Sequence, residues 1–135
     1  MGAMLAFKES FYERTERLKH LFGGALRQSG IIAAAGLYAL ENHVNRLAED
    51  HDNAMYLANR LSEISEIQIE YHENSTNRVF FTWQGKNIFS LQFLERCIEK
   101  GVRFSQVDQN RFRAVTYLGI NKKTIDKVIT IMKDI

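Results

Sequence analysis

The spacing of apolar residues changes between residues 64 and 67, and this change constrains the fold more than any other feature of the sequence. Up to Ile64, apolar residues recur at helical spacing, as in Leu57, Ala58 and Leu61. From Ile67 onward they alternate with polar residues, as a half-buried strand requires. A chain of 135 residues with helices first and short strands afterwards favours an α+β fold.

The order of the predicted elements gives the fold in more detail. Helices are predicted at 7–22, from about 25–28 to about 50, and at 51–64. Strands are predicted at 67–71, 78–83, 102–107 and 111–118, a turn at 73–77, and helices at 91–100 and after a cap at Asn121 or Thr124. We therefore expect N-terminal helices followed by a small, mainly antiparallel sheet that helices cover on one face. We expect a single domain over 1–135, helical over 7–64, with the sheet and its helices over 66–135.

Composition narrows the class of function. A formal net charge of +2 is too weak to predict binding to nucleic acid or to an anionic membrane surface. The longest uncharged run, Gln28–Leu40, is too short to span a bilayer, and the N-terminal residues lack the pattern of a secretory signal. We expect a cytoplasmic protein with no nucleic-acid partner and no membrane partner.

Cysteine, histidine and serine form no catalytic or metal-binding pattern. Cys97 is the only cysteine and lies among apolar residues, which predicts a buried structural thiol. The four histidines lack the i, i+4 spacing of a helical metal site, so no metal is predicted. Asp50-His51-Asp52 can be interpreted as metal ligands or as polar residues at a helix junction, and the second interpretation is preferred. Ser29 and Ser90 lack the flanking glycines of a nucleophile elbow, and no catalytic residue is predicted.

Two arginines are the candidates for binding an anion. Arg27 follows Gly23-Gly24-Ala25 near a predicted helix start, where free N–H groups and the helix dipole favour phosphate or carboxylate. Arg113 lies in the last predicted strand, where alternation places it on one face with Arg111 and Val115. For both arginines, an ordinary solvent-facing side chain is the alternative interpretation.

The segment Gly23–Leu40, GGALRQSGIIAAAGLYAL, resembles the low-specificity L-threonine aldolases. The resemblance continues at 45–54, 75–77 and 113–118. These enzymes are pyridoxal-phosphate-dependent lyases of the aspartate-aminotransferase fold type. They cleave β-hydroxy-α-amino acids of the L-threonine and L-allo-threonine type to glycine and an aldehyde. The resemblance covers nearly all of this chain but only the C-terminal small domain of such a subunit.

The resemblance implies roles for four residues. It assigns Arg113 to binding the carboxylate of the amino-acid substrate, and it assigns Arg27 to a position near the cofactor phosphate. His20 stands where family members usually carry a lysine, and the adjacent Lys19 is a candidate to replace that lysine. Family members also carry a third glycine where Ala25 stands.

The resemblance also implies that the chain is catalytically incomplete. The family's Schiff-base lysine lies upstream of every matched residue, and Gly2–Ala6 resembles the strand that follows its loop. The eight lysines present are interpreted as surface charges. We expect pyridoxal phosphate in the complete enzyme but none bound to this chain, which should be inactive alone. We also expect Gly30–Leu40 to drive formation of a homo-oligomer, a dimer or tetramer. The alternative is a non-catalytic truncated protein or a self-association module.

Overall fold

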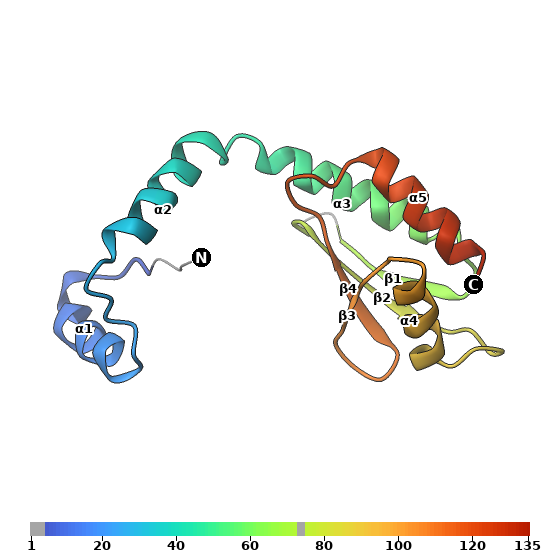
Figure 1. Cartoon of the computed structure of the whole chain (residues 1–135), viewed down its shortest axis with the longest axis horizontal. Coiled ribbons are helices and arrows are strands. Elements are labelled where there is room, and N and C mark those ends of the chain that lie inside the picture. Colours follow the sequence, from blue (N-terminus) through green and yellow to red (C-terminus); the bar gives the residue numbers. More distant parts are fainter. Residues whose placement is uncertain (1–4, 73–74) are drawn as a thin grey trace. The chain divides into compact units, whose positions relative to one another are not determined.

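A computed structural model describes residues 5–72 and 75–135 of the chain. The elements of the described residues, in chain order, are η1 (Glu9–Phe11, a short 3-10 helix), α1 (Tyr12–Leu21), α2 (Gly30–Asn42), α3 (Leu47–Leu61), β1 (Ile67–Glu70), β2 (Arg78–Trp83), α4 (Ser90–Glu99), β3 (Ser105–Gln106), β4 (Arg111–Val115) and α5 (Lys122–Lys133) (Figure 1). Residues 2–4 of the predicted N-terminal strand and 73–74 of the predicted turn lie outside the described residues. The chain forms two compact units, Met1–Asn45 and Arg46–Ile135, and each is described by itself. That the whole chain is a single domain stays a prediction.

The first unit contains α1, α2 and the turn between them. Gly23 has a φ of +73°, a left-handed conformation that favours glycine, and it follows the last residue of α1 and its cap. The amide of Gly24 donates to the carbonyl oxygen of Lys19 at 2.8 Å, which satisfies one of the last carbonyls of α1. Helix α2 begins at Gly30, so the predicted start at 25–28 was wrong. The first complete helical bond runs from the amide of Ala33 to the carbonyl of Ser29, which fixes this later start.

Helix α2 has an unusual amount of exposed apolar surface. It carries no charged residue before Glu41, and its side chains Ile31, Leu37 and Tyr38 are 78%, 60% and 60% exposed. None of the described residues of η1, α1 or α2 is buried. Together α1 and α2 line an apolar groove of about 1060 Å³ within the first unit. Apolar surface of this extent is typical of a site that another protein surface covers.

The second unit contains a four-stranded sheet in the order β1-β2-β4-β3, and every neighbouring pair is antiparallel. In the register, Phe81 of β2 lies between Ile69 of β1 and Phe112 of β4. These three side chains share one face because residues that are directly paired on neighbouring strands point to the same side of the sheet. The predicted α+β fold with a small antiparallel sheet is therefore confirmed.

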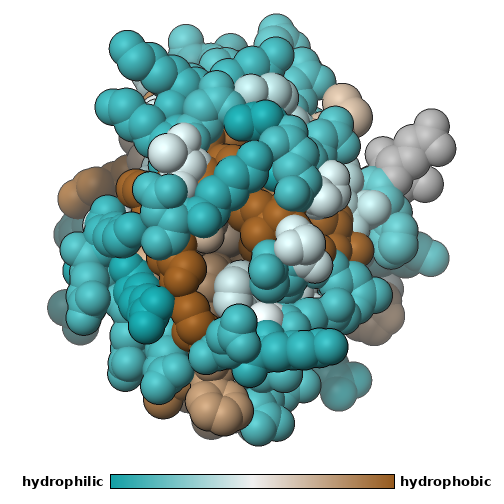
Figure 2. All heavy atoms as spheres, turned by 90° about the vertical axis from the view of Figure 1, so that its right-hand side faces the viewer, coloured by the Kyte–Doolittle hydropathy of each residue, from teal (hydrophilic) through white to brown (hydrophobic). Residues whose placement is uncertain are grey.

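Helices α3, α4 and α5 cover the same face of the sheet and form the core with it (Figure 1). The fully buried larger side chains come from all three helices and from the two central strands: Phe81, Phe93, Phe112, Leu61, Ile125, Ile129, Met132 and Val79. The rings of Trp83 and Phe93 stack with centroids 4.1 Å apart. Hydrophilic side chains occupy most of the face shown in Figure 2, with apolar side chains visible between them. The predicted covering of one sheet face by helices is confirmed.

The break between the second and third helices lies at 43–46, and the predicted boundary after Asp50 was wrong. The run NHVN at 42–45 consists of weak helix formers, which explains why α2 ends there. Arg46 then precedes a new helix, and its guanidinium donates to the Asp50 carboxylate one turn later. The triplet 50–52 therefore lies inside α3 and not at a helix junction.

Strands β3 and β4 are shorter than predicted by three residues or more. β3 contains only Ser105–Gln106, because the amide of Val102 donates to the carbonyl of Cys97 at 2.8 Å and continues the end of α4. β4 ends at Val115, because the chain turns at Tyr117, whose carbonyl accepts from the amide of Ile120 at 2.9 Å. Among the described residues, no helix combines the length and apolar character needed to cross a membrane.

Candidate functional site

Arg113 lies in the middle of β4, on the sheet face opposite the helices. Its strand neighbours Phe112 and Ala114 are buried in the core, so alternation directs Arg113 to the other face. The predicted alternation along this strand is therefore confirmed. The register places Phe80 of β2 and Ser105 of β3 on either side of Arg113.

The Arg113 guanidinium is only partly satisfied by the residues that the structure describes. Its Nη2 donates to Oγ of Ser105 at 3.3 Å. Its buried Nε–H has no hydrogen-bond partner among the described residues, and none of the ion pairs found among them involves Arg113. A half-buried guanidinium in this state favours an external anion, and its planar donors match a carboxylate or a phosphate.

Glu70, the only acidic residue in the four described strands, is paired with Arg111 instead. Arg111 Nη2 lies 2.8 Å from Oε2 of Glu70, and Arg111 Nε donates to both carboxylate oxygens at 3.0 and 3.1 Å. These hydrogen bonds lower the pKa of Glu70, despite an opposing effect of burial. The Arg111 guanidinium also lies over the ring of Phe80, 4.7 Å from its centroid. Glu70 is thus held as a carboxylate by Arg111, which lies two residues from Arg113 on the same strand.

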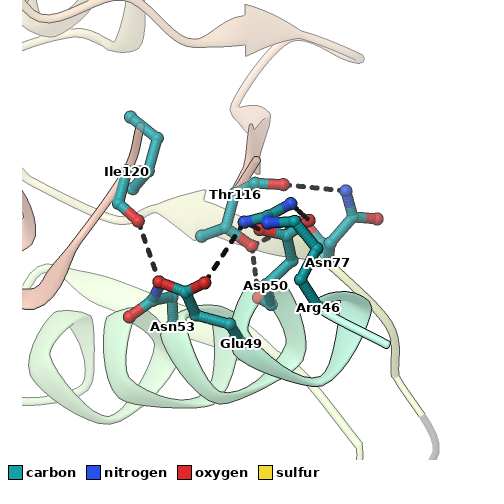
Figure 3. A network of polar contacts seen from close by, with 7 residues as sticks. All are labelled: Arg46, Glu49, Asp50, Asn53, Asn77, Thr116 and Ile120. Carbon is teal, nitrogen blue, oxygen red and sulfur yellow. Dashed lines mark hydrogen bonds and ion pairs between the residues drawn. The ribbon is translucent and has the colours of Figure 1, made fainter. Parts of the chain in front are cut away.

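A buried polar network fixes the end of β4 against α3 (Figure 3). The hydroxyl of Thr116, which is 1% exposed, donates to the carbonyl of Asp50 at 2.6 Å. The Thr116 amide donates to the carbonyl of Asn77 at 3.0 Å, and the Asn77 side chain donates back at 2.8 Å. Asp50 in turn accepts two hydrogen bonds from Arg46, at 2.9 and 3.1 Å. Because Thr116 follows Arg113 by three residues, this network stiffens the strand that carries Arg113.

The other three predicted site residues lie in the first unit. Lys19 and His20 occupy the last turn of α1, and Arg27 lies in the turn before α2. All three side chains are exposed. Arg27 lies close to the start of α2, where a guanidinium suits a phosphate group, whereas Lys19 and His20 lie at the C-terminal end of α1. The cofactor-proximal role of these three residues, with Arg27 near the cofactor phosphate, stays a prediction, and so does the binding of the substrate carboxylate by Arg113.

The remaining chemistry-bearing residues have structural surroundings. Cys97 is buried in the core, and burial raises the pKa of its thiol to about 11, so the predicted buried thiol is confirmed. The carboxylate of Asp50 forms an ion pair with the guanidinium of Arg46. The described residues contain no group of three potential metal ligands. All eight lysines are exposed, as predicted: Lys8, Lys19, Lys86, Lys100, Lys122, Lys123, Lys127 and Lys133.

Sequence reasoning found Arg113 but missed both the Arg111–Glu70 pair and the network at Thr116. Arg111 and Glu70 are 41 residues apart, and their contact depends on the pairing of three strands. The one local signal was the i, i+4 spacing of Arg46 and Asp50, which favours a helical ion pair.

Comparison with known proteins identifies the family. The family model described as Beta-eliminating lyase matches residues 1–85. The chain belongs to the beta-eliminating lyase family. This member is 33% identical over 128 residues to the low specificity L-threonine aldolase of Escherichia coli (strain K12), a match that covers 95% of this chain and 36% of that protein. It is 26% identical over 118 residues to low-specificity L-threonine aldolase 1 of Arabidopsis thaliana, covering 87% of this chain and 33% of that protein.

The predicted resemblance to low-specificity L-threonine aldolases is therefore confirmed. This chain spans about a third of the length of the curated relatives that it matches.

Solved structures share the fold of this family member. An 8-amino-7-oxononanoate synthase from Francisella tularensis superposes with a TM-score of 0.68 at 13% identity, covering 94% of this chain and 39% of that chain. The K223A mutant of C-DES, with glycine covalently linked to its pyridoxal-phosphate cofactor, gives a TM-score of 0.64 at 14% identity, covering 78% and 28%. At these identities the likeness shows the fold alone.

Proposed function

We propose that this chain forms the C-terminal small domain of a pyridoxal-phosphate-dependent threonine aldolase. The complete enzyme cleaves β-hydroxy-α-amino acids of the L-threonine and L-allo-threonine type to glycine and an aldehyde. The observation that supports this most is Arg113, a partly satisfied guanidinium on a firmly held strand. The family match and the named aldolase relatives support the reaction class.

In this proposal, Arg113 binds the carboxylate of the amino-acid substrate. A guanidinium and a carboxylate form two parallel N–H···O bonds, which fix the orientation of the amino acid as well as its position. Ser105 and the network at Thr116 restrict the side chain and the strand, so less conformational entropy is lost on binding. Arg113 thereby orients the substrate, and it moves no proton.

The residues present fit the phosphate end of pyridoxal phosphate. Arg27 precedes α2 and offers its guanidinium near the free N–H groups of that helix start, and Lys19 and His20 in the last turn of α1 offer further N–H donors. When bound, the cofactor supplies the electron sink for the electron pair of the broken Cα–Cβ bond. All eight lysines of the chain are exposed, and we propose that the lysine holding the cofactor belongs to the part of the subunit upstream of the matched residues.

A hybrid enzyme tests this function. In it, this chain replaces the matching 128 residues of the Escherichia coli L-threonine aldolase, to which it is 33% identical. We expect the hybrid enzyme, supplied with pyridoxal phosphate, to release acetaldehyde and glycine from L-threonine, measured by coupled reduction of the aldehyde. The unmodified Escherichia coli enzyme is the control. A folded hybrid enzyme that binds pyridoxal phosphate but does not cleave L-threonine or L-allo-threonine would contradict the proposal.

We further propose that α2 mediates homo-oligomer formation, as a dimer or tetramer. Its exposed apolar side chains include Ile31 and Leu37, and burying them against another copy is favourable. We expect the 135-residue chain to self-associate in sedimentation velocity experiments. Leu37→Glu should shift the distribution towards monomer, whereas Met55→Glu, at a comparably exposed position in α3, should not. A chain that stays monomeric at high concentration would exclude this role for α2.

A further inference from the structure

One row of side chains crosses the open face of the sheet. Glu70, Phe80, Arg113 and Ser105 are successive partners on β1, β2, β4 and β3. Neighbouring strands lie about 4.8 Å apart, so the backbones of Glu70 and Arg113 are separated by about 10 Å, with the Phe80 ring between them. By register, Glu70 and Arg113 are therefore candidates for an ion pair.

Arg111 demonstrates that an arginine on β4 can reach Glu70. Its partner on β2 is Thr82, so Arg111 lies two residues along the strand from the row of Glu70. It still crosses β2 and places Nη2 2.8 Å from the Glu70 carboxylate. Arg113 is in line with Glu70 and has no greater gap to cross. The length of the arginine side chain therefore does not explain why Glu70 pairs with Arg111 and not with Arg113.

Three contacts hold Glu70 at Arg111 instead. The Arg111 guanidinium makes a bonded ion pair with the carboxylate and lies over the Phe80 ring. Thr82, the partner of Arg111 on β2, also holds Glu70: its hydroxyl donates to Oε1 of Glu70 at 3.2 Å. These contacts leave the Arg113 guanidinium with one bond, to Ser105, among the described residues.

We propose that Arg111 is a positioning residue: it holds Glu70 away from Arg113 and so keeps the Arg113 guanidinium free for the substrate carboxylate. This inference rests on the proposed function of Arg113. Glu70 is a carboxylate attached to the same sheet, so it is an internal competitor for the substrate's own carboxylate. Without Arg111, Glu70 turns to Arg113 and substrate must displace it.

The first test follows the pKa of Glu70 in the 135-residue chain by NMR of its side-chain carboxyl carbon. Arg111 now lowers that pKa, and Thr82 and His72 add smaller effects that are common to all variants. In Arg111→Met we expect the pKa to stay lowered, because Arg113 replaces Arg111 as the partner. In Arg111→Met/Arg113→Met it should rise. A rise already in the single variant, or no rise in the double variant, would overturn the inference.

The second test measures steady-state kinetics in the hybrid enzyme. Arg111→Met should raise the KM for L-threonine about 2- to 5-fold, the effect of one partly exposed ion pair, and leave kcat unchanged. Adding Glu70→Gln should restore the KM, because the competing charge is gone. Damage to the fold would not be repaired by removing a second charge. If KM rises and Glu70→Gln does not restore it, Arg111 has no positioning role.

The two tests also separate this inference from the proposed function. If Arg113→Ala leaves the KM for L-threonine unchanged, the carboxylate-binding role of Arg113 fails, and the positioning role fails with it. If Arg113→Ala raises the KM but the pKa of Glu70 rises in Arg111→Met, only the positioning role of Arg111 fails.

Discussion

Replacing Arg113 with alanine in the hybrid enzyme is expected to raise the KM for L-threonine roughly 10- to 150-fold. This corresponds to about 1.5–3 kcal/mol, the usual contribution of a hydrogen bond to a charged group. The effect is large because the substrate carboxylate loses its cation, and the neighbouring Arg111 guanidinium is already paired with Glu70. Initial rates over a range of L-threonine concentrations measure it. Affinity for pyridoxal phosphate should be nearly unchanged, because Arg113 addresses the substrate.

Two matched variants define what the Arg113→Ala result means. Arg113→Lys keeps the charge but loses the planar pair of donors, so we expect an intermediate KM. Arg78→Ala removes an exposed arginine from the same sheet face, and its KM should stay within about two-fold of the unsubstituted hybrid enzyme. Equal effects of Arg78→Ala and Arg113→Ala would indicate a general electrostatic contribution and no specific carboxylate site.

The 135-residue chain alone is expected to release no acetaldehyde from L-threonine. A lysine that reacts specifically with pyridoxal phosphate requires desolvation or a neighbouring cation, and all eight lysines here are exposed. Borohydride reduction after mixing with pyridoxal phosphate should therefore label no single lysine stoichiometrically, as measured by peptide mass spectrometry. Labelling of one lysine at one equivalent per chain would show that this chain holds the cofactor by itself.

Much of the fold follows from periodicity in the sequence. Alternation of apolar and polar residues predicted the four strands, and it placed Phe112 and Ala114 on the face opposite Arg113, as observed. The helix boundary predicted after Asp50 was wrong because apolar spacing continues through the run at 42–45. There the low helix propensity of four successive residues ends α2, and the Arg46–Asp50 pair supports the next helix.

The contacts around Arg113 could not be predicted from the sequence. Its polar neighbour Ser105 depends on the antiparallel pairing of β3 with β4, and periodicity does not specify which strands pair. The bond from the Thr116 hydroxyl to the carbonyl of Asp50 joins residues 66 positions apart. Such contacts are set by packing of the whole second unit, so the sequence predicted the face on which Arg113 lies but not the contacts that hold it.

Inhibition of the hybrid enzyme by glycine and by glycinamide tests the carboxylate-binding role of Arg113 most directly. The two compounds differ only in the charged carboxylate, which glycinamide replaces with a neutral amide. We predict that Arg113→Ala weakens inhibition by glycine roughly 10- to 150-fold and changes inhibition by glycinamide by no more than about two-fold. If Arg113→Ala weakens inhibition by glycine and by glycinamide to the same extent, or weakens neither, the assignment of Arg113 to the substrate carboxylate is contradicted.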